Sequence, residues 1–170
     1  MKETVQEYIA RIQGKVGGKD PLRVQSTTAK KLGSLLKRQT PAKLRKRPAP
    51  DKWSVAEILA HLADAEIVTS WRVRSILGAP GTPLQAFDQD AWAAAGQYAR
   101  RDARKSLEQF RVLREGNLAL FKSLKPEQWK HYGMHAERGE ESLETILLRI
   151  AGHDINHLEQ IEAILAAKKY

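Results

Sequence analysis

Apolar residues recur along most of the chain at intervals of three and four positions, which is the period of an amphipathic α-helix. Four such segments cover about residues 20–38, 54–77, 102–124 and 142–165. The alternating pattern of β-branched or aromatic residues that is typical of strands is nearly absent. The pattern therefore predicts an all-α protein, and four helices of this length favour a four-helix bundle.

Several residues mark where the predicted helices begin and end. Ser54 and Glu57 form an S-x-x-E capping box at the start of the second segment. Gly78 opens a turn-rich stretch that ends this helix. Asp102 is the expected N-cap of the third helix, and Ser142 opens the fourth. The connections between these helices are longer than those of most bundles.

Two parts of the chain lie outside the four helices. Residues 3–12 can form a further helix that glycines at positions 14, 17 and 18 interrupt, so we expect a helical extension or an arm over residues 1–19 and a bundle domain over residues 20–170. The long connection over residues 84–101 predicts a short extra helix near residues 88–98, lying over one end of the bundle.

The composition suits one globular domain, with 170 residues of which 42% are hydrophobic and 29% charged. Because the chain has no cysteine, a disulfide scaffold, a Cys-ligated metal and a protein thiol nucleophile are excluded. Any metal must be held by His, Asp or Glu. We find no signal-peptide core and no apolar run long enough to span a membrane, so the expected location is the cytoplasm and no membrane partner is expected.

Positive charge is concentrated in the N-terminal third. Residues 1–52 contain 14 Lys and Arg against 4 Asp and Glu, whereas residues 53–170 contain 15 against 16. The densest part, residues 37–47, is expected to be a helix end followed by an exposed linker, because prolines surround it. No aromatic residues interleave with these charges, as base stacking requires. Nucleic-acid binding therefore stays only an alternative.

Two histidines occupy the apolar stripe of the fourth predicted helix. His153 and His157 stand four residues apart between Ile150 and Ile161, so both rings should face the interior with Cβ atoms about 5–6 Å apart. Two rings placed in this way can bind one metal ion at about 2.0–2.1 Å from each nitrogen. His61, on the inward side of the second predicted helix, can supply a third ligand.

Such a site would contain three neutral imidazoles with open coordination positions, the pattern of catalytic metals. Asp64, one turn after His61, can accept a ring N–H. The alternative for each histidine is a core residue that is hydrogen-bonded to a carbonyl. Asp154 fits a surface residue and a base equally well.

Two further histidine patterns are disfavoured as metal sites. His131 and His135 lack an apolar helical frame, so they are predicted to lie in a loop. Residues 153–157 are similar to the H-E-x-x-H motif of zinc peptidases, but Asp154 replaces the glutamate and no further ligand follows. The strands of such peptidases are also missing, so a peptidase is not expected.

Two stretches carry a resemblance to a known family. Residues 53–62, with the cap and His61, and residues 152–161, Gly-His-Asp-Ile-Asn-His-Leu-Glu-Gln-Ile, are similar to the DinB/YfiT superfamily of metal-binding four-helix bundles. The resemblance covers about residues 20–167, with its pieces in the family's order. It implies a divalent metal, most often nickel or zinc, bound by residues matching His61, His153 and His157, commonly in a homodimer.

The resemblance also implies candidate activities. Members of the family include S-transferases that use low-molecular-weight thiols and a thiol-dependent maleylpyruvate isomerase, and many others carry a hydrolase label. Our first hypothesis is a metal-dependent transferase in which a thiol cofactor attacks an electrophilic small molecule. The absence of cysteine fits hydrolysis by an activated water equally well, so a metal-dependent hydrolase is the alternative.

The remaining candidate groups can be assigned to a pocket or to ordinary packing. Asp64, Asn156 and Gln160 are candidate groups beside the ligands, with plain helix surface as the alternative. Phe87 and Trp92 either form the roof of the pocket or simply pack. A second hypothesis is a non-catalytic stress-response protein whose basic N-terminal third faces nucleic acid. A third hypothesis, which we rank last, is a bundle that has lost its metal.

Overall fold

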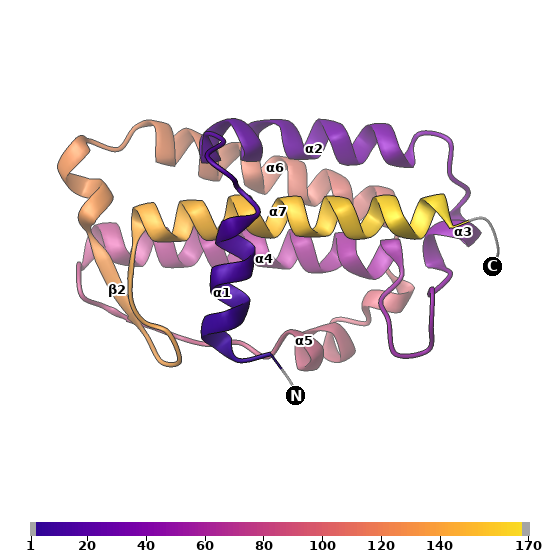
Figure 1. Cartoon of the computed structure of the whole chain (residues 1–170), viewed down its shortest axis with the longest axis horizontal. Helices are drawn as coiled ribbons and strands as arrows, with labels where there is room; N and C mark the ends of the chain where they lie inside the picture. Colours follow the sequence, from indigo (N-terminus) through magenta and orange to yellow (C-terminus); the bar gives the residue numbers. More distant parts are fainter. Residues whose placement is uncertain (1–2, 168–170) are drawn as a thin grey trace.

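In the computed structural model, which describes residues 3–167, four long helices run side by side along the molecule (Figure 1). They are α2 (Pro21–Leu36), α4 (Val55–Gly78), α6 (Ala103–Lys122) and α7 (Leu143–Ala166). Helices α4 and α2 each pack against both α6 and α7, so the four helices enclose a common core. The predicted all-α four-helix bundle is confirmed. Residues 1–2 of the expected N-terminal extension and residues 168–170 of the expected bundle domain lie outside the described part of the chain.

The helices begin where the sequence places their caps. The Ser54 hydroxyl accepts a hydrogen bond from the Glu57 N–H, and the Glu57 carboxylate accepts one from the Ser54 N–H, which completes the capping box of α4. Asp102 caps α6, and Ser142 caps α7. These caps fix where the helices begin, and the apolar residues of α4 and α7 that pack into the core decide which faces turn inward.

Apolar residues from all four helices fill the core. Phe110 of α6 and Ile58 of α4 are completely buried at the end of the bundle where α7 finishes. Near the start of α7 a second cluster surrounds Ile146 and Phe121. The Phe121 ring stacks on the Trp129 ring, with centroids 5.9 Å apart. The polar centre described below belongs to neither cluster.

The N-terminal extension is a helix, α1 (Val5–Gly14), which crosses α7 transversely (Figure 1). Its Ile12 is fully buried, and Gly152 of α7 lies directly beneath it. A Cβ atom on Gly152 would lie 1.9 Å from the carbonyl oxygen of Ile12, so only glycine permits this close crossing. Gly17 and Gly18, both with positive φ, then turn the chain into α2.

The basic segment after α2 is more ordered than an exposed linker. Thr40 caps a short helix, α3 (Pro41–Arg45), with Pro41 in its first turn. Leu44 of this helix is buried in the core, and Arg47 forms an ion pair with Glu57. The helix end and the exposure expected for residues 37–47 are confirmed, since only Gln39 and Leu44 among them are not exposed. The expected linker is wrong in one respect, because the segment contains α3 and the buried Leu44 anchors it.

A small sheet also departs from the sequence-based expectation. It has the order β1 (Pro83–Leu84), β2 (Tyr132–His135) and β3 (Gly139–Ser142), with β1 parallel to β2 and β2 antiparallel to β3. The predicted loop at His131 and His135 is thus wrong for His135, which lies on β2. Strands of two to four residues are too short to show an alternating pattern, and β1 pairs with a segment far away in the chain.

The long connection after β1 contains the predicted short helix. Helix α5 (Gln89–Ala95) is capped by Asp88, and the 3₁₀ turn η1 (Tyr98–Arg100) follows it. A second 3₁₀ turn, η2 (Pro126–Lys130), precedes β2. Helix α5 contacts α4 beside the middle of the bundle, not over one of its ends as expected (Figure 1). Within residues 3–167, no helix combines the length and the apolar character that crossing a membrane requires.

Candidate metal centre

Three histidines from two helices meet inside the bundle. His61 lies two turns after the start of α4, and His153 and His157 lie on consecutive turns of α7. His61 is 3% exposed and His157 8% exposed. The ring nitrogens of the three side chains all lie within 4.8 Å of one another. The inward orientation predicted from the apolar stripes therefore holds for all three rings.

The separations between the ring nitrogens suit a shared cation. The Nε2 atom of His153 lies 3.0 Å from Nε2 of His61 and 3.1 Å from Nε2 of His157. Two nitrogens at about 2.1 Å from one ion lie about 3.0 Å apart at a right angle and about 3.4 Å apart at a tetrahedral angle. The arrangement therefore fits three imidazole ligands on one face of an ion.

Hydrogen bonding among the rings cannot by itself explain this cluster. His157 Nδ1 lies 2.9 Å from the Gln160 side-chain oxygen, so it carries the proton of a neutral ring and leaves Nε2 with a lone pair. His153 Nε2 can carry at most one proton but faces two neighbouring nitrogens. At least one of these contacts therefore lacks a well-directed hydrogen bond, and a bound cation would satisfy both.

Burial keeps the three rings neutral, as metal ligation requires. It lowers the pKa of His61 to about 3, with a further contribution from His157. Burial is also the main cause that lowers the pKa of His153 well below its ordinary value, and the pKa of His157 is lowered in the same direction. All three side chains can therefore offer lone pairs at neutral pH.

The structure gives the three predicted neighbouring groups different partners. Gln160 contacts His157, as described above. Asn156 accepts a hydrogen bond from Arg11 of α1 at 3.2 Å. Asp64 accepts hydrogen bonds from the Tyr98 hydroxyl at 2.7 Å and from Arg101 at 3.0 Å, in place of the expected ring N–H. Gln160 alone of these three candidates touches a histidine of the cluster.

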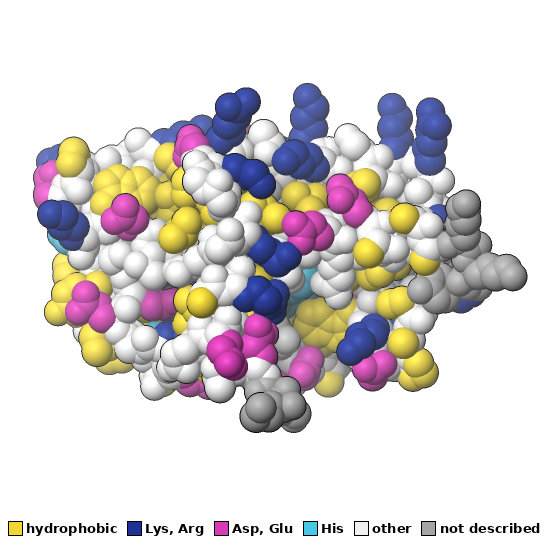
Figure 2. Space-filling model, in the orientation of Figure 1, with side chains coloured by type: hydrophobic (Ala, Val, Ile, Leu, Met, Phe, Trp, Pro, Cys, Tyr) yellow, Lys and Arg dark blue, Asp and Glu magenta, His cyan; other side chains and the backbone are white. Residues whose placement is uncertain are grey.

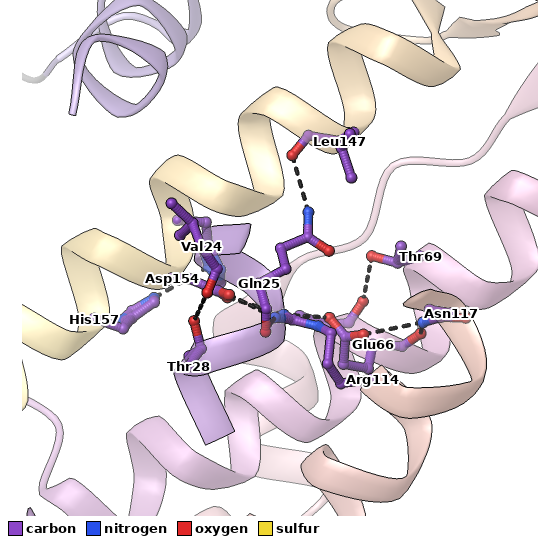
Figure 3. A network of polar contacts seen from close by, with 12 residues as sticks. Val24, Gln25, Thr28, Glu66, Thr69, Arg114, Asn117, Leu147, Asp154 and His157 are labelled. Atoms are coloured by element: carbon purple, nitrogen blue, oxygen red, sulfur yellow. Dashed lines mark hydrogen bonds and ion pairs between the residues drawn. The ribbon is translucent and has the colours of Figure 1, made fainter. Parts of the chain in front are cut away.

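A buried ionic network lies beside the histidines, and sequence reasoning missed it (Figure 3). Arg114 of α6 binds both oxygens of Asp154, at 2.5 and 2.9 Å, and one oxygen of Glu66 at 2.8 Å. Asn117 donates to Glu66 at 3.0 Å. The signal in the sequence was a set of polar residues at inward-facing helix positions. Asp154 is consequently neither a surface residue nor a free base.

Aromatic side chains line one side of the centre. The Trp53 ring lies 5.2 Å from the His61 ring, centroid to centroid, and 6.2 Å from the ring of Tyr98. Phe87 and Trp92 contact each other at 4.9 Å, and Phe87 also lines the cavity above the histidines. These contacts shield His61 and give the cavity an apolar wall.

The three histidines open into a cavity of about 620 Å³. Its walls come from α4 and α7, and α1 closes one side with Val5, Tyr8 and Ile9. Figure 2 shows histidine surface in a depression beside α1. This volume lies within the range of about 300–1,000 Å³ that is usual for small-molecule sites.

Fold and geometry together define a four-helix bundle with a candidate metal centre in its interior. A model of the DinB superfamily matches residues 26–161. The chain therefore belongs to the DinB superfamily, as its resemblance to DinB/YfiT proteins implied.

Two similar proteins were found by sequence and by structure. The chain is 24% identical over 140 residues, 82% of this chain and 80% of the relative, to a protein of Oceanobacillus iheyensis named "Putative metal-dependent hydrolase OB0413". The solved structure of YfiT from Bacillus subtilis matches with a TM-score of 0.78 and 21% identity, over 96% of this chain and 88% of YfiT. YfiT is described as a probable metal-dependent hydrolase with an unusual four-helix bundle topology. This structural likeness shows the fold.

Proposed function

We propose that His61, His153 and His157 bind one divalent metal ion and that the protein is a metal-dependent enzyme acting on a small molecule. The observation that supports this proposal is the convergence of three buried, neutral imidazoles at the wall of a large cavity. The names of the two similar proteins, both of which refer to metal-dependent hydrolases, point in the same direction.

A divalent ion held by imidazoles lowers the pKa of a coordinated water or thiol and so supplies a nucleophile near neutral pH. The chain's own residues position the donors. Gln160 keeps the proton of His157 on Nδ1, and Trp53 packs against the His61 ring. Asp154 and Glu66 are tied to Arg114, so neither carboxylate is free to accept a proton. A proton acceptor would therefore have to be another group, such as the substrate, water or one of the other carboxylates that line the cavity.

Hydrolysis is the reaction we propose first, because of the names of the relatives. Transfer from a low-molecular-weight thiol is the second candidate. The cavity volume of about 620 Å³ is compatible with both reactions, because it is usual for a small-molecule site. A chain without cysteine would also have to take sulfur from a diffusible molecule. Nickel and zinc are the proposed metals, and imidazole ligands suit both.

Elemental analysis of purified protein tests the ligand assignment. We expect about one equivalent of divalent metal in the unaltered protein and a near-complete loss in His157→Ala, because two imidazoles bind much more weakly than three. The matched control is His131→Ala, which removes a histidine outside the cluster and should keep full occupancy. A His157→Ala protein that is helical and retains its metal would refute the assignment.

The reaction class is tested with the metal-loaded protein and with protein emptied by a chelator. One panel contains activated esters and amides, and the other contains an electrophile with individual low-molecular-weight thiols. Turnover of the first panel alone supports hydrolysis, whereas thiol-dependent turnover supports transfer. Activity that persists after the metal has measurably been removed would exclude both versions of the mechanism.

A further inference from the structure

The cavity extends from the histidines to a region formed by three arginines. Arg72 lies on α4, Arg149 on α7, and Arg138 in the turn between β2 and β3. All three side chains line the same cavity as the three histidines. We call these three arginines the arginine end of the cavity.

Arg72 is a buried cation without a carboxylate partner. The residue is 4% exposed, and among the residues that the structure describes no acidic group lies within ion-pair distance of it. Its Nη2 donates to the carbonyl oxygen of Gln85 at 2.6 Å. A buried charge normally requires a counter-charge, because leaving water costs several kcal/mol.

The second neighbour of Arg72 cannot accept its proton. His135 Nδ1 accepts a hydrogen bond from the Glu137 backbone N–H at 3.1 Å. In a neutral ring the proton therefore sits on Nε2, which lies 3.2 Å from Nη2 of Arg72. Two N–H groups face each other at this contact, and neither can satisfy the other. One N–H of Nη2 donates to Gln85, but the N–H that faces His135 and the Nε2–H of His135 find no acceptor in each other.

Arg114, in the same cavity wall, provides an internal comparison. It is 2% exposed, and two carboxylates, Asp154 and Glu66, neutralise it. Among the described residues, the fold therefore gives Arg114 two carboxylate partners and gives Arg72 none. The unmatched charge belongs specifically to the arginine end.

The other groups around Arg72 leave this end positive. Arg138 and Arg149 share the carboxylate of Glu141, at 2.8 and 3.1 Å. Glu137 and Glu141 are the acidic groups that act on Arg72 electrostatically. The arginine end therefore contains three positive guanidinium groups and two negative carboxylates. Burial and the two neighbouring arginines lower the pKa of Arg72 to about 10, so it stays charged at neutral pH.

The spacing along the helices limits the shape of a ligand that reaches both ends. Eleven residues separate His61 from Arg72, which is about 16 Å along α4 and places both on nearly the same helix face. Arg149 precedes His153 by four residues, or about 6 Å along α7. A group bound at Arg72 therefore lies well away from the histidines, and a ligand that spans both ends must be elongated.

We propose that the arginine end of the cavity binds the anionic group of an elongated small-molecule substrate, a carboxylate or a phosphate, with Arg72 as its principal partner. The inference deepens and rests on the proposed function, because it assigns the substrate class of the same cavity. The substrate would carry its reactive group at the histidines and its acidic group at Arg72. An anionic oxygen there would accept from Arg72, whose side chain lines the cavity.

Anion binding is measured on metal-free protein by calorimetry at low ionic strength, so that the probe cannot bind through the metal. Inorganic phosphate and acetate serve as separate probes and distinguish the two kinds of acidic group. We expect Arg72→Gln to weaken binding of the preferred probe about 10- to 100-fold, the usual effect of losing a charge-assisted hydrogen bond. The matched control Arg23→Gln, on the exposed face of α2, should change the affinity for the same probe less than about twofold.

His153→Ala separates this inference from the proposed metal centre. It should abolish metal binding and leave anion binding unchanged. If the metal-free Arg72→Gln protein binds both anions as tightly as the unaltered protein, the inference is wrong even when the metal assignment holds. Because Arg72 also supports Gln85, Arg138→Gln provides a second variant that alters no helix. Unchanged anion binding in that variant would also contradict the proposal.

Discussion

At the scale of single residues, Gln160 differs from Asn156 and Asp64 in its contact with a histidine of the cluster. It lies three residues after His157 on α7 and contacts Nδ1 of that ring at 2.9 Å. The contact selects the tautomer that leaves Nε2 free for a metal. Asn156, on the same helix, instead accepts from Arg11 of α1. From their spacing along the helix, Asn156 and Gln160 were equal candidates. The packing of α1 gives Asn156 another partner, Arg11, and leaves Gln160 beside His157.

Gln160→Leu should therefore weaken metal binding about 10- to 100-fold while the bundle stays helical, because the His157 ring loses the group that orients it. Competition against a metal indicator of known affinity measures the change. Asn156→Leu is the matched control, an identical substitution on the same helix that should leave the affinity near its original value. Equal losses in the two variants would show that Gln160 has no special role.

The Arg114 network makes a separate prediction about stability. Arg114→Gln leaves Asp154 and Glu66 buried without their partner, which should lower the free energy of unfolding by about 3–5 kcal/mol. Arg111→Gln, on the same helix, removes an arginine that pairs with Glu108 at the exposed surface and should cost at most about 1 kcal/mol. Urea unfolding followed by circular dichroism gives both values. Similar costs would mean that burial does not strengthen the Arg114 pairs.

At the scale of secondary-structure elements, the crossing of α1 over α7 links the N-terminal helix to the metal centre. Gly152, where the two helices touch, immediately precedes His153. Ile12 is buried at the crossing, and Lys15 pairs with Glu159 at 2.5 Å further along α7. Helix α1 also supplies one wall of the cavity. The sequence predicted either a helix or an arm for residues 1–19. The structure shows a helix that forms part of the cavity wall.

Gly152→Ala should displace α1, because the added methyl group would lie 1.9 Å from the Ile12 carbonyl oxygen. We expect a loss of about 1–3 kcal/mol in unfolding free energy and faster amide exchange in α1 than in the rest of the bundle. Gly116→Ala is the control on α6, where no atom lies within 4 Å of the new Cβ. That variant should gain up to about 1 kcal/mol from helix propensity. Unchanged exchange in α1 of the Gly152 variant would contradict the close crossing.

At the scale of the whole molecule, part of the excess positive charge lies on an exposed edge formed by α2. Lys and Arg side chains project along the edge of the molecule that α2 occupies (Figure 2). Arg23, Lys30 and Lys31 of α2 are exposed, and none of the exposed large hydrophobic residues is on this helix. Such a surface attracts polyanions without the stacking groups that retain single strands.

We therefore predict that duplex and single-stranded DNA bind detectably at low salt and negligibly at physiological ionic strength, since counterion release is the main contribution. Fluorescence anisotropy across a salt series tests this. Lys30→Glu with Lys31→Glu should remove the low-salt binding. Micromolar affinity that persists at physiological salt would favour the nucleic-acid alternative. The homodimer implied by the resemblance stays a prediction, which sedimentation equilibrium can test.

The chain itself determined the four helices, their caps and the inward position of the three histidines, because these depend on local periodicity and on contacts within a few residues. It could not determine the short sheet, the buried Leu44 or the partners of Asp64 and Asp154. These features arise where segments far apart in the chain meet, and local patterns carry no information about such meetings. The same reason separates Arg114 from Arg72. Both are helical arginines, and only the tertiary structure shows that, among the described residues, Arg114 has two carboxylate partners and Arg72 has none, although both line the same cavity.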